Sequence, residues 1–402
     1  MSRPTRRTRI VCISDTHNTT VKLPKGDVLI HAGDLTNQGS YSEAVQWLEK
    51  ADFEAKIVIA GNHDITLDSA FYAEHGLTFH NKIPQDPAKC RTLLTESRTI
   101  TYLEHGSVTV RLRRPDGPRT EFTVFGSPYS PQYGTWAFMY PRADAGELAT
   151  AADEGNTSTK VTARPTAAAL WSAIPATTDI LITHTPPAMH CDSSLGCPQL
   201  GRALARVRPR LHVCGHVHQA RGAERVMWDV DGANGGGVEE VPGILSREVW
   251  QDPNPDPTSA KISLVDLTGR KGSRPLAFQE EPVEMTVVAE EPPGMGAGSE
   301  QSGLDAATAS QVVEGVGPRS KETEATEMSV SESKSDDLLP RDASVASVPG
   351  CSESMMRWPD RLGRRETCVV NAAIMSTSWP HFGAGKQRNK PIVVDIDLPV
   401  WE

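Results

Sequence analysis

The sequence predicts a layered α/β fold, and three observations lead to this class. Short apolar segments of the kind that form buried strands recur through the first 220 residues. Amphipathic segments with a helical period lie between some of them. Two strand-like segments, 108–112 and 121–126, lie close enough in the sequence to form a β-hairpin. This mixture favours helices layered on sheets.

The individual elements follow from the same patterns. Strands are predicted at 9–14, 27–32, 56–60, 108–112, 121–126, 179–184 and 211–215. One helix is predicted over 40–52, with Ser40 as its cap, and another over 197–208. The residues that share one face of the first helix would be Ala44, Trp47 and Leu48. Further strands are expected at 261–267, 367–375 and 391–399.

The composition changes sharply over residues 291–350. This segment has no aromatic residue and contains ten serines, seven glycines and five prolines. Its four basic and eleven acidic residues give a charge of −7, out of −10 for the whole chain. Such a segment cannot bury enough apolar surface to offset the entropy of ordering it, so we expect disorder here.

The simplest organisation is one domain with a long insert. The domain would span 8–270, a low-complexity and mostly disordered insert 271–365, and strands that complete the sandwich 366–400. The alternative is a domain that ends near residue 270 and is followed by an unrelated small β unit. The acidic insert could recruit protein partners.

Composition also limits the setting. The seven cysteines are scattered and form no C-x-x-C pair, which argues against a structural zinc site and favours free thiols in a reducing compartment. No apolar run reaches the ~18 residues of a membrane span, and no signal-peptide core follows the basic N-terminus. We therefore expect a cytoplasmic protein without membrane contact. The net charge of −10 argues mildly against nucleic-acid binding.

Polar residues follow directly after five of the predicted strands. In sequence order, the motifs are "SDTHN", "AGDLTNQG", "AGNHD", "ITHTPP" and "CGHVH". Any one of them alone is more often a solvated strand end, a turn or a helix cap than a ligand site. Ligands bind beyond the carboxyl ends of strands in open α/β sheets, so five such motifs together predict a metal site.

The candidate ligands offer oxygen and nitrogen donors and no sulfur. They are Asp15, His17, Asp34, Asn62, His184, His216 and His218. This donor set suits Mn²⁺, Fe or Zn²⁺, and seven ligands are too many for one tetrahedral ion but suit two. Two ions about 3.5–4 Å apart can clamp a phosphoryl group and lower the pKa of a bound water to about 7.

The ordered motifs resemble the calcineurin-like metallophosphoesterase superfamily. The segments "IVIAGNHDITLD", "GSPYSPQYGTWAF", "DILITHTPP" and "RVRPRLHVCGHVHQARG" resemble more closely the metallophosphoesterase-domain-containing proteins of the brain-expressed type and their fungal relatives. The likeness covers roughly 8–230 and the strand after residue 366. It implies a four-layer α/β/β/α sandwich.

The resemblance also implies a role for each site residue. A first metal ion would be held by Asp15, His17 and His218. A second would be held by Asn62, His184 and His216. Asp34 would bridge both ions, and His63 would protonate the leaving group. Phosphoprotein phosphatases carry an aspartate where this chain has Asn37, which puts protein phosphatase activity in doubt.

We therefore expect a dinuclear metal-dependent phosphoesterase in which a metal-bridging hydroxide attacks phosphorus. The substrate would be a small phosphodiester, with cyclic nucleotides included, or a related phosphate ester. A cluster of aromatic residues could wall its pocket or simply be a buried loop: Tyr129, Tyr133, Trp136 and Phe138. The alternatives are a low-activity metal-binding scaffold and a nuclease, although no basic groove is evident in the sequence.

Removal of residues 291–350 should leave the phosphodiesterase rate and the melting temperature nearly unchanged. A segment without aromatic residues contributes little to a core, and joining its flanks changes the loop entropy only slightly. Thermal unfolding, together with turnover of bis(p-nitrophenyl) phosphate, compares the deletion variant with the full chain. An insoluble or inactive variant would show that the segment is structural.

Overall fold

A computed structural model describes residues 3–40, 42–80, 82–142, 164–230, 243–277, 364–377 and 387–401. These residues belong to one compact unit, Met1–Pro282 and Glu353–Glu402. A second unit, Val283–Ser352, lies outside the described residues. The insert expected at 271–365 therefore falls almost wholly outside them, and its disorder stays a prediction.

Six strands form the first sheet. Their spatial order is β13 (Ser263–Asp266), β15 (Ile392–Pro399), β1 (Thr5–Ile13), β2 (Val28–Ala32), β3 (Ala55–Ile59) and β4 (Thr101–Leu103). Strands β1 to β4 run parallel, whereas β15 is antiparallel to β1. The carboxyl ends of β1, β2 and β3 consequently lie along one edge.

Seven strands form the second sheet. Their spatial order is β12 (Gly243–Val249), β11 (Gly222–Asp229), β14 (Glu366–Asn371), β10 (Leu211–Cys214), β9 (Ile180–Thr183), β6 (Glu121–Ser127) and β5 (Gly106–Arg111). Strands β6, β9, β10 and β14 are parallel to their neighbours in this group. The antiparallel pair of β5 and β6 confirms the predicted hairpin. A separate pair consists of β7 (Ser130–Pro131) and β8 (Met139–Tyr140).

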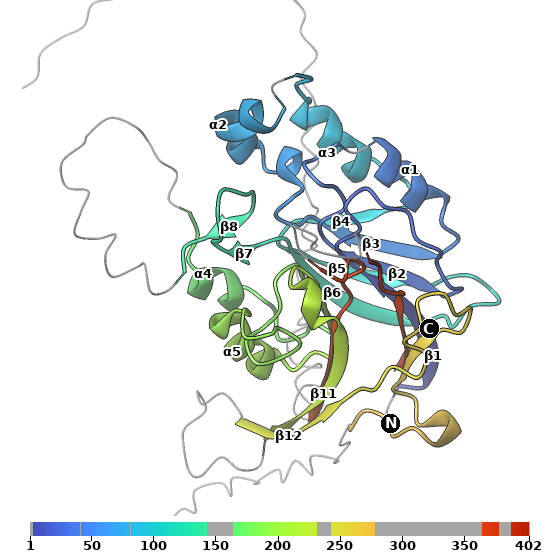
Figure 1. Cartoon of the computed structure of the whole chain (residues 1–402). Helices are drawn as coiled ribbons and strands as arrows, with labels where there is room; N and C mark the ends of the chain where they lie inside the picture. The colour runs from blue at the N-terminus through green and yellow to red at the C-terminus, as the bar shows by residue number, and fades with distance from the viewer. Residues whose placement is uncertain are drawn as a thin grey trace, which may run out of the picture. The chain divides into compact units, whose positions relative to one another are not determined.

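Helices cover the outer face of each sheet (Figure 1). The first sheet is covered by α1 (Ser42–Lys50), α2 (Ser69–Phe79) and α3 (Pro87–Thr95). The second is covered by α4 (Ala167–Ser172) and α5 (Pro198–Val207). Short 3-10 turns occur at Ile65–Leu67, His218–Ala220 and Arg270–Gly272. The predicted four-layer sandwich is thereby confirmed.

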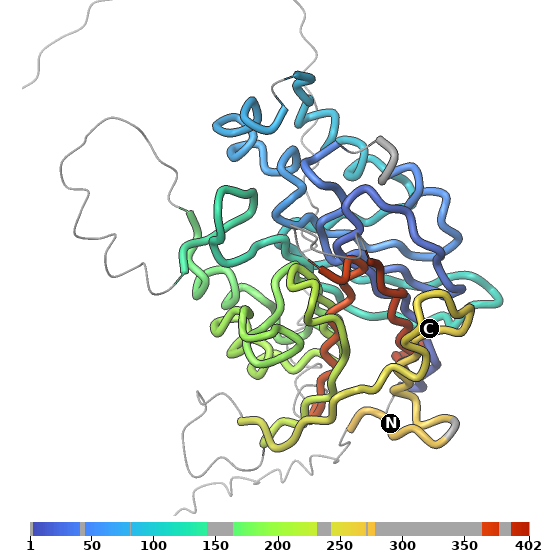
Figure 2. Tube along the Cα trace, in the orientation of Figure 1, coloured from blue at the N-terminus to red at the C-terminus, as the bar shows by residue number. Residues whose placement is uncertain are grey.

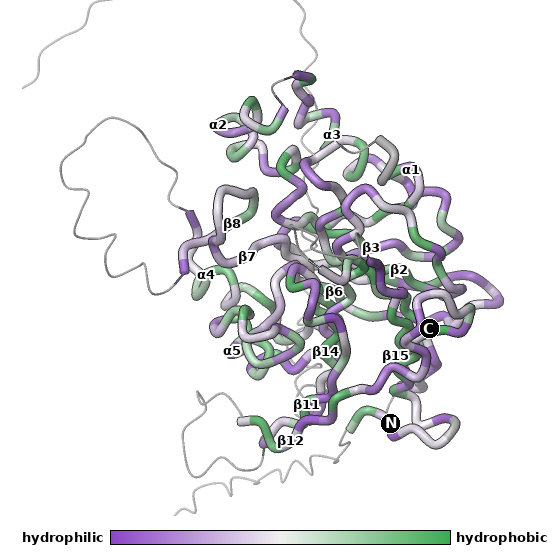
Figure 3. Tube along the Cα trace, viewed as in Figure 1, coloured by the Kyte–Doolittle hydropathy of each residue, from purple (hydrophilic) through white to green (hydrophobic). Residues whose placement is uncertain are grey.

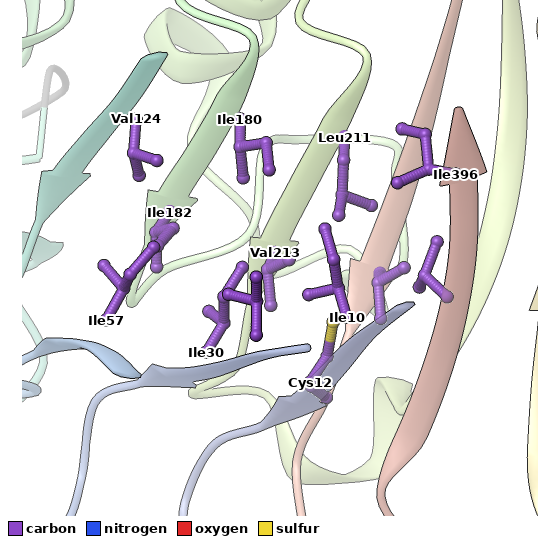
Figure 4. Close-up of a cluster of buried hydrophobic side chains, with 14 of the residues drawn as sticks. Ile10, Cys12, Ile30, Ile57, Val124, Ile180, Ile182, Leu211, Val213 and Ile396 are labelled. Carbon is purple, nitrogen blue, oxygen red and sulfur yellow. The ribbon is translucent and has the colours of Figure 1, made fainter. Parts of the chain in front are cut away.

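The alternation of side chains along each strand explains the layers. In β1, Ile10 and Cys12 face the second sheet, whereas Val11 and Ile13 face the helices. Figure 4 shows the inner layer, in which side chains such as Ile30 meet residues of the second sheet. All of these side chains are fully buried, so the space between the sheets is a packed apolar core.

The strands that follow the long insert are built into both sheets. Figure 2 shows these last segments, in red, running beside much earlier parts of the chain. Strand β14 lies between β10 and β11, and β15 lies between β1 and β13. The alternative of an unrelated terminal β unit is therefore wrong. The domain boundaries at 8–270, 271–365 and 366–400 stay a prediction.

All ten strand segments expected from the sequence are strands, and both expected helices are present as α1 and α5. The sequence analysis missed the helices α2, α3 and α4 and the strands β4, β7, β8, β11 and β12. Helix α2 mixes hydrophobic and hydrophilic residues (Figure 3), and only Phe71 and Gly76 are buried in it. Every residue of β12 is exposed, so no period-two pattern marks it. No helix in the described part of the chain has the length and apolarity needed to cross a bilayer.

A buried carboxylate links the segment just before the insert to the strand just after it. Glu366 in β14 accepts hydrogen bonds from Arg225 at 2.8 and 3.0 Å and from Arg274 at 2.6 and 2.9 Å. It also accepts one from the backbone N–H of Ala277 at 2.7 Å. Burial raises the pKa of Glu366, but the hydrogen bonds from both arginines outweigh it and hold the pKa below its ordinary value.

Glu366→Ala should lower the free energy of unfolding by roughly 3–5 kcal/mol, because it leaves the buried Arg225 without its carboxylate. Glu248→Ala is the matched control: its side chain is 65% exposed and forms an ion pair with Arg274, so its loss should cost less than about 1 kcal/mol. Because the folded pKa of Glu366 is depressed, its contribution is present above the unfolded pKa of about 4.3 and is lost as the pH falls through the folded value. Urea unfolding of both variants at pH 7 and pH 4 measures this. Equal stability losses in the two variants would contradict it.

Candidate metal centre

Five loops meet where parallel strands of both sheets end. Those after β1, β2 and β3 come from the first sheet, and those after β9 and β10 come from the second. Backbone hydrogen bonds join them: Asp15 N–H donates to Gly33 at 2.9 Å and Gly215 N–H donates to His184 at 3.0 Å. The structure brings all eight residues predicted for the site together here.

One group of ligand atoms gathers around His218. Its Nε2 lies 3.3 Å from Oδ1 of Asp15 and 3.4 Å from Nε2 of His17. Nε2 of His17 lies 3.6 Å from Oδ2 of Asp34. Asp15, His17 and His218 are all buried and could hold one cation.

A second group lies on the other side of Asp34. Oδ1 of Asp34 is 3.4 Å from Nε2 of His184. Oδ1 of Asn62 is 3.0 Å from the same nitrogen and 2.9 Å from Nδ1 of His216. Asp34 therefore turns one oxygen toward each group. Asp15 is also within reach of a cation held by Asp34 and His184, an overlap that the sequence analysis did not foresee.

The tautomers of three histidines suit metal ligation. Their Nδ1 atoms face backbone carbonyls: His17 faces Thr36 at 3.2 Å, His184 faces Ala32 at 2.9 Å and His218 faces Thr377 at 3.0 Å. When these rings are neutral, Nδ1 therefore carries the proton and the lone pair of Nε2 points into the cluster. In that neutral form, the lone pairs of His17 and His218 face each other at 3.4 Å and cannot hydrogen-bond one another. A cation between them resolves this conflict, so the residues fit a metal.

The backbone is forced into unusual shapes at the site. Four of the candidate ligands have left-handed φ values of 54°, 45°, 53° and 66°: Asp15, His17, Asp34 and His216. Such strain persists only where the surroundings fix it, and it is typical of functional sites. Glycine is needed beside two ligands, since a Cβ on Gly215 would lie 2.3 Å from Oδ2 of Asp15 and one on Gly61 would lie 2.3 Å from Oδ1 of Asp34.

His63 lies at the rim, partly exposed, beside these ligands. Its Nδ1 donates to the backbone carbonyl of Asn37 at 2.9 Å, which leaves Nε2 free for a substrate. The ring stacks on Trp136 with centroids 3.8 Å apart and meets the edge of His17 at 4.8 Å. Of the other predicted pocket aromatics, Phe138 is buried and Tyr133 is 75% exposed.

A family model described as calcineurin-like phosphoesterase matches residues 8–220 of the 402. The matched segment contains the five loops and all eight site residues. The chain belongs to the calcineurin-like phosphoesterase family. The resemblance seen in the sequence motifs is therefore confirmed.

Two similar proteins match part of the chain. Metallophosphoesterase domain-containing protein 1 from Homo sapiens is 36% identical over 239 residues, which cover 55% of this chain and 63% of that protein. Probable rhamnogalacturonate lyase C from Emericella nidulans is 40% identical over 228 residues, which cover 55% of this chain but 18% of that protein. The chain thus spans less than two thirds of either relative.

Among solved structures, phosphopantetheinyl hydrolase from Mycobacterium tuberculosis has a similar structure. The similarity covers 54% of this chain and 83% of the hydrolase chain. The sequence identity is 17% and the TM-score is 0.32, values too low to bear on the function of this calcineurin-like chain.

Charge in the metal centre is controlled by burial and by neighbouring charges. Burial raises the pKa of Asp15, but the nearby His218 outweighs this effect and lowers the pKa to about 2. Burial lowers the pKa of His184, yet the charge of Asp34 raises it to about 9. Burial dominates at His17 and lowers its pKa to about 4. The carboxylates are thus ionised at neutral pH and attract cations.

Three residues that support the site had no assigned role in the sequence analysis or only an uncertain one. The carboxylate of Asp64 accepts from backbone N–H groups of Leu35, Thr36 and Gly61, and so joins two ligand loops. Asn371 donates to the carbonyl of Val217 at 3.0 Å, between His216 and His218. No local pattern marks Asn371 as a site residue, because it lies far along the chain from the ligand loops, after the insert. Trp136, by contrast, was among the aromatic candidates.

His216→Ala and His218→Ala should each weaken the binding of one metal ion and abolish most turnover, with little loss of folded structure. Both residues lie in a loop beyond β10, outside the apolar core, so their removal leaves the sandwich intact. Metal content by mass spectrometry and circular dichroism checks both statements. His75→Ala, on α2, serves as the control. Retention of two ions and full activity in either variant would remove that residue from the ligand set.

Proposed function

We propose that this chain is a dinuclear metal-dependent phosphoesterase that hydrolyses small phosphodiesters. The observation that carries the proposal is the position of His63. It is a partly exposed imidazole, oriented through Nδ1, beside seven clustered ligand candidates of which six are buried. That combination supports a site for metal ions with a proton donor next to it.

The ligand roles in this proposal follow the two groups of atoms. A first ion would be held by Asp15, His17 and His218. A second would be held by Asn62, His184 and His216, with Asp34 between the two. Mn, Fe or Zn ions suit these mixed donors. When bound, such ions supply charge stabilisation at phosphorus and a hydroxide nucleophile at neutral pH.

His63 has a separate task in the proposal. The carbonyl of Asn37 accepts the proton on Nδ1, so the proton that is transferred is the one on Nε2. The departing alkoxide takes this proton, a step that contributes ~10²–10⁴-fold in comparable enzymes. Trp136 packs against one face of the ring and restricts its rotation, which keeps Nε2 directed at the leaving group.

Two features favour a diester as the substrate. In the described ranges, Asp15 and Asp34 form ion pairs with histidines and with no lysine or arginine. A diester carries less negative charge than a monoester and needs fewer cationic groups. In addition, Trp136 and the exposed Tyr133 offer aromatic surfaces on which a nucleobase can stack. Cyclic nucleotides are therefore the leading candidates, and Asn37 argues against protein phosphatase activity.

A reducing, cytoplasmic setting is part of the same proposal. The six cysteines of the described residues are all free, and five of them are buried. Buried thiols without disulfides are typical of such compartments. Protein partners of the acidic segment concern residues outside the described ones and stay a prediction.

His63→Asn should lose far more activity on a cyclic nucleotide than on bis(p-nitrophenyl) phosphate. The alkoxide leaving group needs a proton, whereas nitrophenolate is a weak base and hardly needs one. We expect a loss of ~10²–10⁴-fold in kcat/KM on the cyclic nucleotide and less than about tenfold on the nitrophenyl diester. The measurement is the ratio of the two kcat/KM values at fixed Mn²⁺, with metal content recorded.

Asp34→Asn is the matched control, because loss of a metal ligand should lower kcat/KM on both substrates to a similar extent. Equal losses in the His63 variant, or loss of its metal, would mean that His63 acts on the ions or the nucleophile. If the wild-type chain loaded with Mn²⁺ turns over neither substrate, the chain is better described as a low-activity metal-binding scaffold than as an enzyme.

A further inference from the structure

A cavity separate from the candidate metal centre lies on the helix-covered side of the seven-stranded sheet. It has a volume of about 330 Å³, at the lower end of the range for small-molecule sites. Its lining includes Met189, His190, Arg202, Trp228 and Ile244, and none of the eight residues of the metal centre. The walls come from the loop between β9 and α5, from α5 itself, and from β11 and β12.

His190, which lines this cavity, belongs to a buried imidazole–carboxylate pair. Nδ1 of His190 hydrogen-bonds to Oε1 of Glu224 in β11. His190 is 2% exposed and Glu224 is 6% exposed. Nε2 of His190 has no hydrogen-bond partner in the described part of the chain. Nε2 is also not among the enclosed polar atoms that lack a partner, so it is open to the cavity, where a ligand can engage it.

The loop that carries His190 is strained and tightly held. Left-handed φ values of 73°, 48°, 45° and 65° occur at Met189, Cys191, Ser193 and Ser194. The Asp192 carboxylate accepts from the backbone N–H groups of Met189 at 3.0 Å and Gly196 at 3.1 Å. Arg247 of β12 donates to the Met189 carbonyl at 2.9 Å. Strain that is fixed by so many contacts is typical of a binding loop.

Gly201 keeps the cavity open. It lies in the interior of α5, where glycine is less favourable than alanine, and it lines the cavity. A Cβ there would meet only ordinary contacts, the nearest being the Ala188 carbonyl oxygen at 3.5 Å. Local packing therefore does not require glycine, but a larger side chain would enter the open space.

Arg202 supplies a cation at the same place. It is exposed, lines the cavity, and its recorded side-chain contact is with Oε1 of Gln199 at 3.4 Å. Among the described residues it forms no ion pair with a carboxylate. The other lining residues include apolar side chains such as Trp228 and Ile244. An apolar cavity with one cation and one imidazole nitrogen matches an apolar molecule with a single acidic group.

We infer that this cavity is a binding site for a small apolar carboxylic acid, separate from the metal centre. The carboxyl group engages Nε2 of His190 and the guanidinium of Arg202, and the apolar body packs on Trp228 and Ile244. The contact between the carboxyl group and Nε2 holds one shared proton, because an ionised carboxylate facing an unprotonated Nε2 would bring two lone pairs together. A phosphate would bring a second charge into a cavity with only one arginine.

The test uses octanoate as the probe, with octan-1-ol as the uncharged analogue, and isothermal titration calorimetry on the full chain. We expect one saturable octanoate site and binding of octanol at least tenfold weaker. Arg202→Gln and His190→Ala should each weaken octanoate binding at least tenfold. Gly201→Leu should abolish it by filling the cavity.

Three controls keep the result interpretable. Gly201→Ala improves the helix without filling the space and should bind octanoate as the wild type does. Arg98→Gln removes an exposed arginine that does not line the cavity and should also have no effect. Metal removal with EDTA should leave binding unchanged, so failure here is distinguishable from failure of the proposed phosphoesterase. Absence of saturable binding, or octanoate binding that Gly201→Leu leaves intact, would overturn the inference.

Discussion

The apolar core between the two sheets is the constraint on which the rest of the structure depends. Side chains such as Ile10 and Ile30 from the first sheet and Ile182 and Val213 from the second belong to one fully buried cluster. Because a strand's side chains alternate, this packing fixes which face of each strand points inward and where each strand ends. The five ligand loops meet only because the core holds β1, β2 and β3 against β9 and β10 at a fixed position.

That rigid frame lets the loops adopt conformations that would be unfavourable alone. Free energy is lost in two ways. The backbone is left-handed at residues such as Asp15 and Asp34, and these two residues also place ionised carboxylates close together. Burial of the core offsets these costs. A bound cation would offset them further, so metal binding and the stability of the loops should be coupled.

The loop between β9 and α5 connects the candidate metal centre with the cavity at His190. It starts at His184 in the metal centre and continues to His190 at this cavity. Asn371 hydrogen-bonds to the carbonyls of both Cys191 and Val217, so it contacts this loop and the loop of His216 and His218. The segments after the insert therefore do more than fill gaps in the sheets, since β14 ends at the residue that fastens both loops.

The sequence by itself predicted the strands of the core and the residues that gather at the candidate metal centre. Both depend on local patterns: apolar runs of strand length, and glycine, aspartate and histidine directly after them. Tertiary structure alone decided the rest. The Glu224–His190 pair, the reach of Asp15 into both ligand groups and the role of Asn371 join residues that are far apart in the chain. A local sequence pattern specifies which face of a helix or strand is apolar. Only tertiary packing specifies which other residues that face contacts. For the same reason β12, exposed along its whole length, carried no sequence signal.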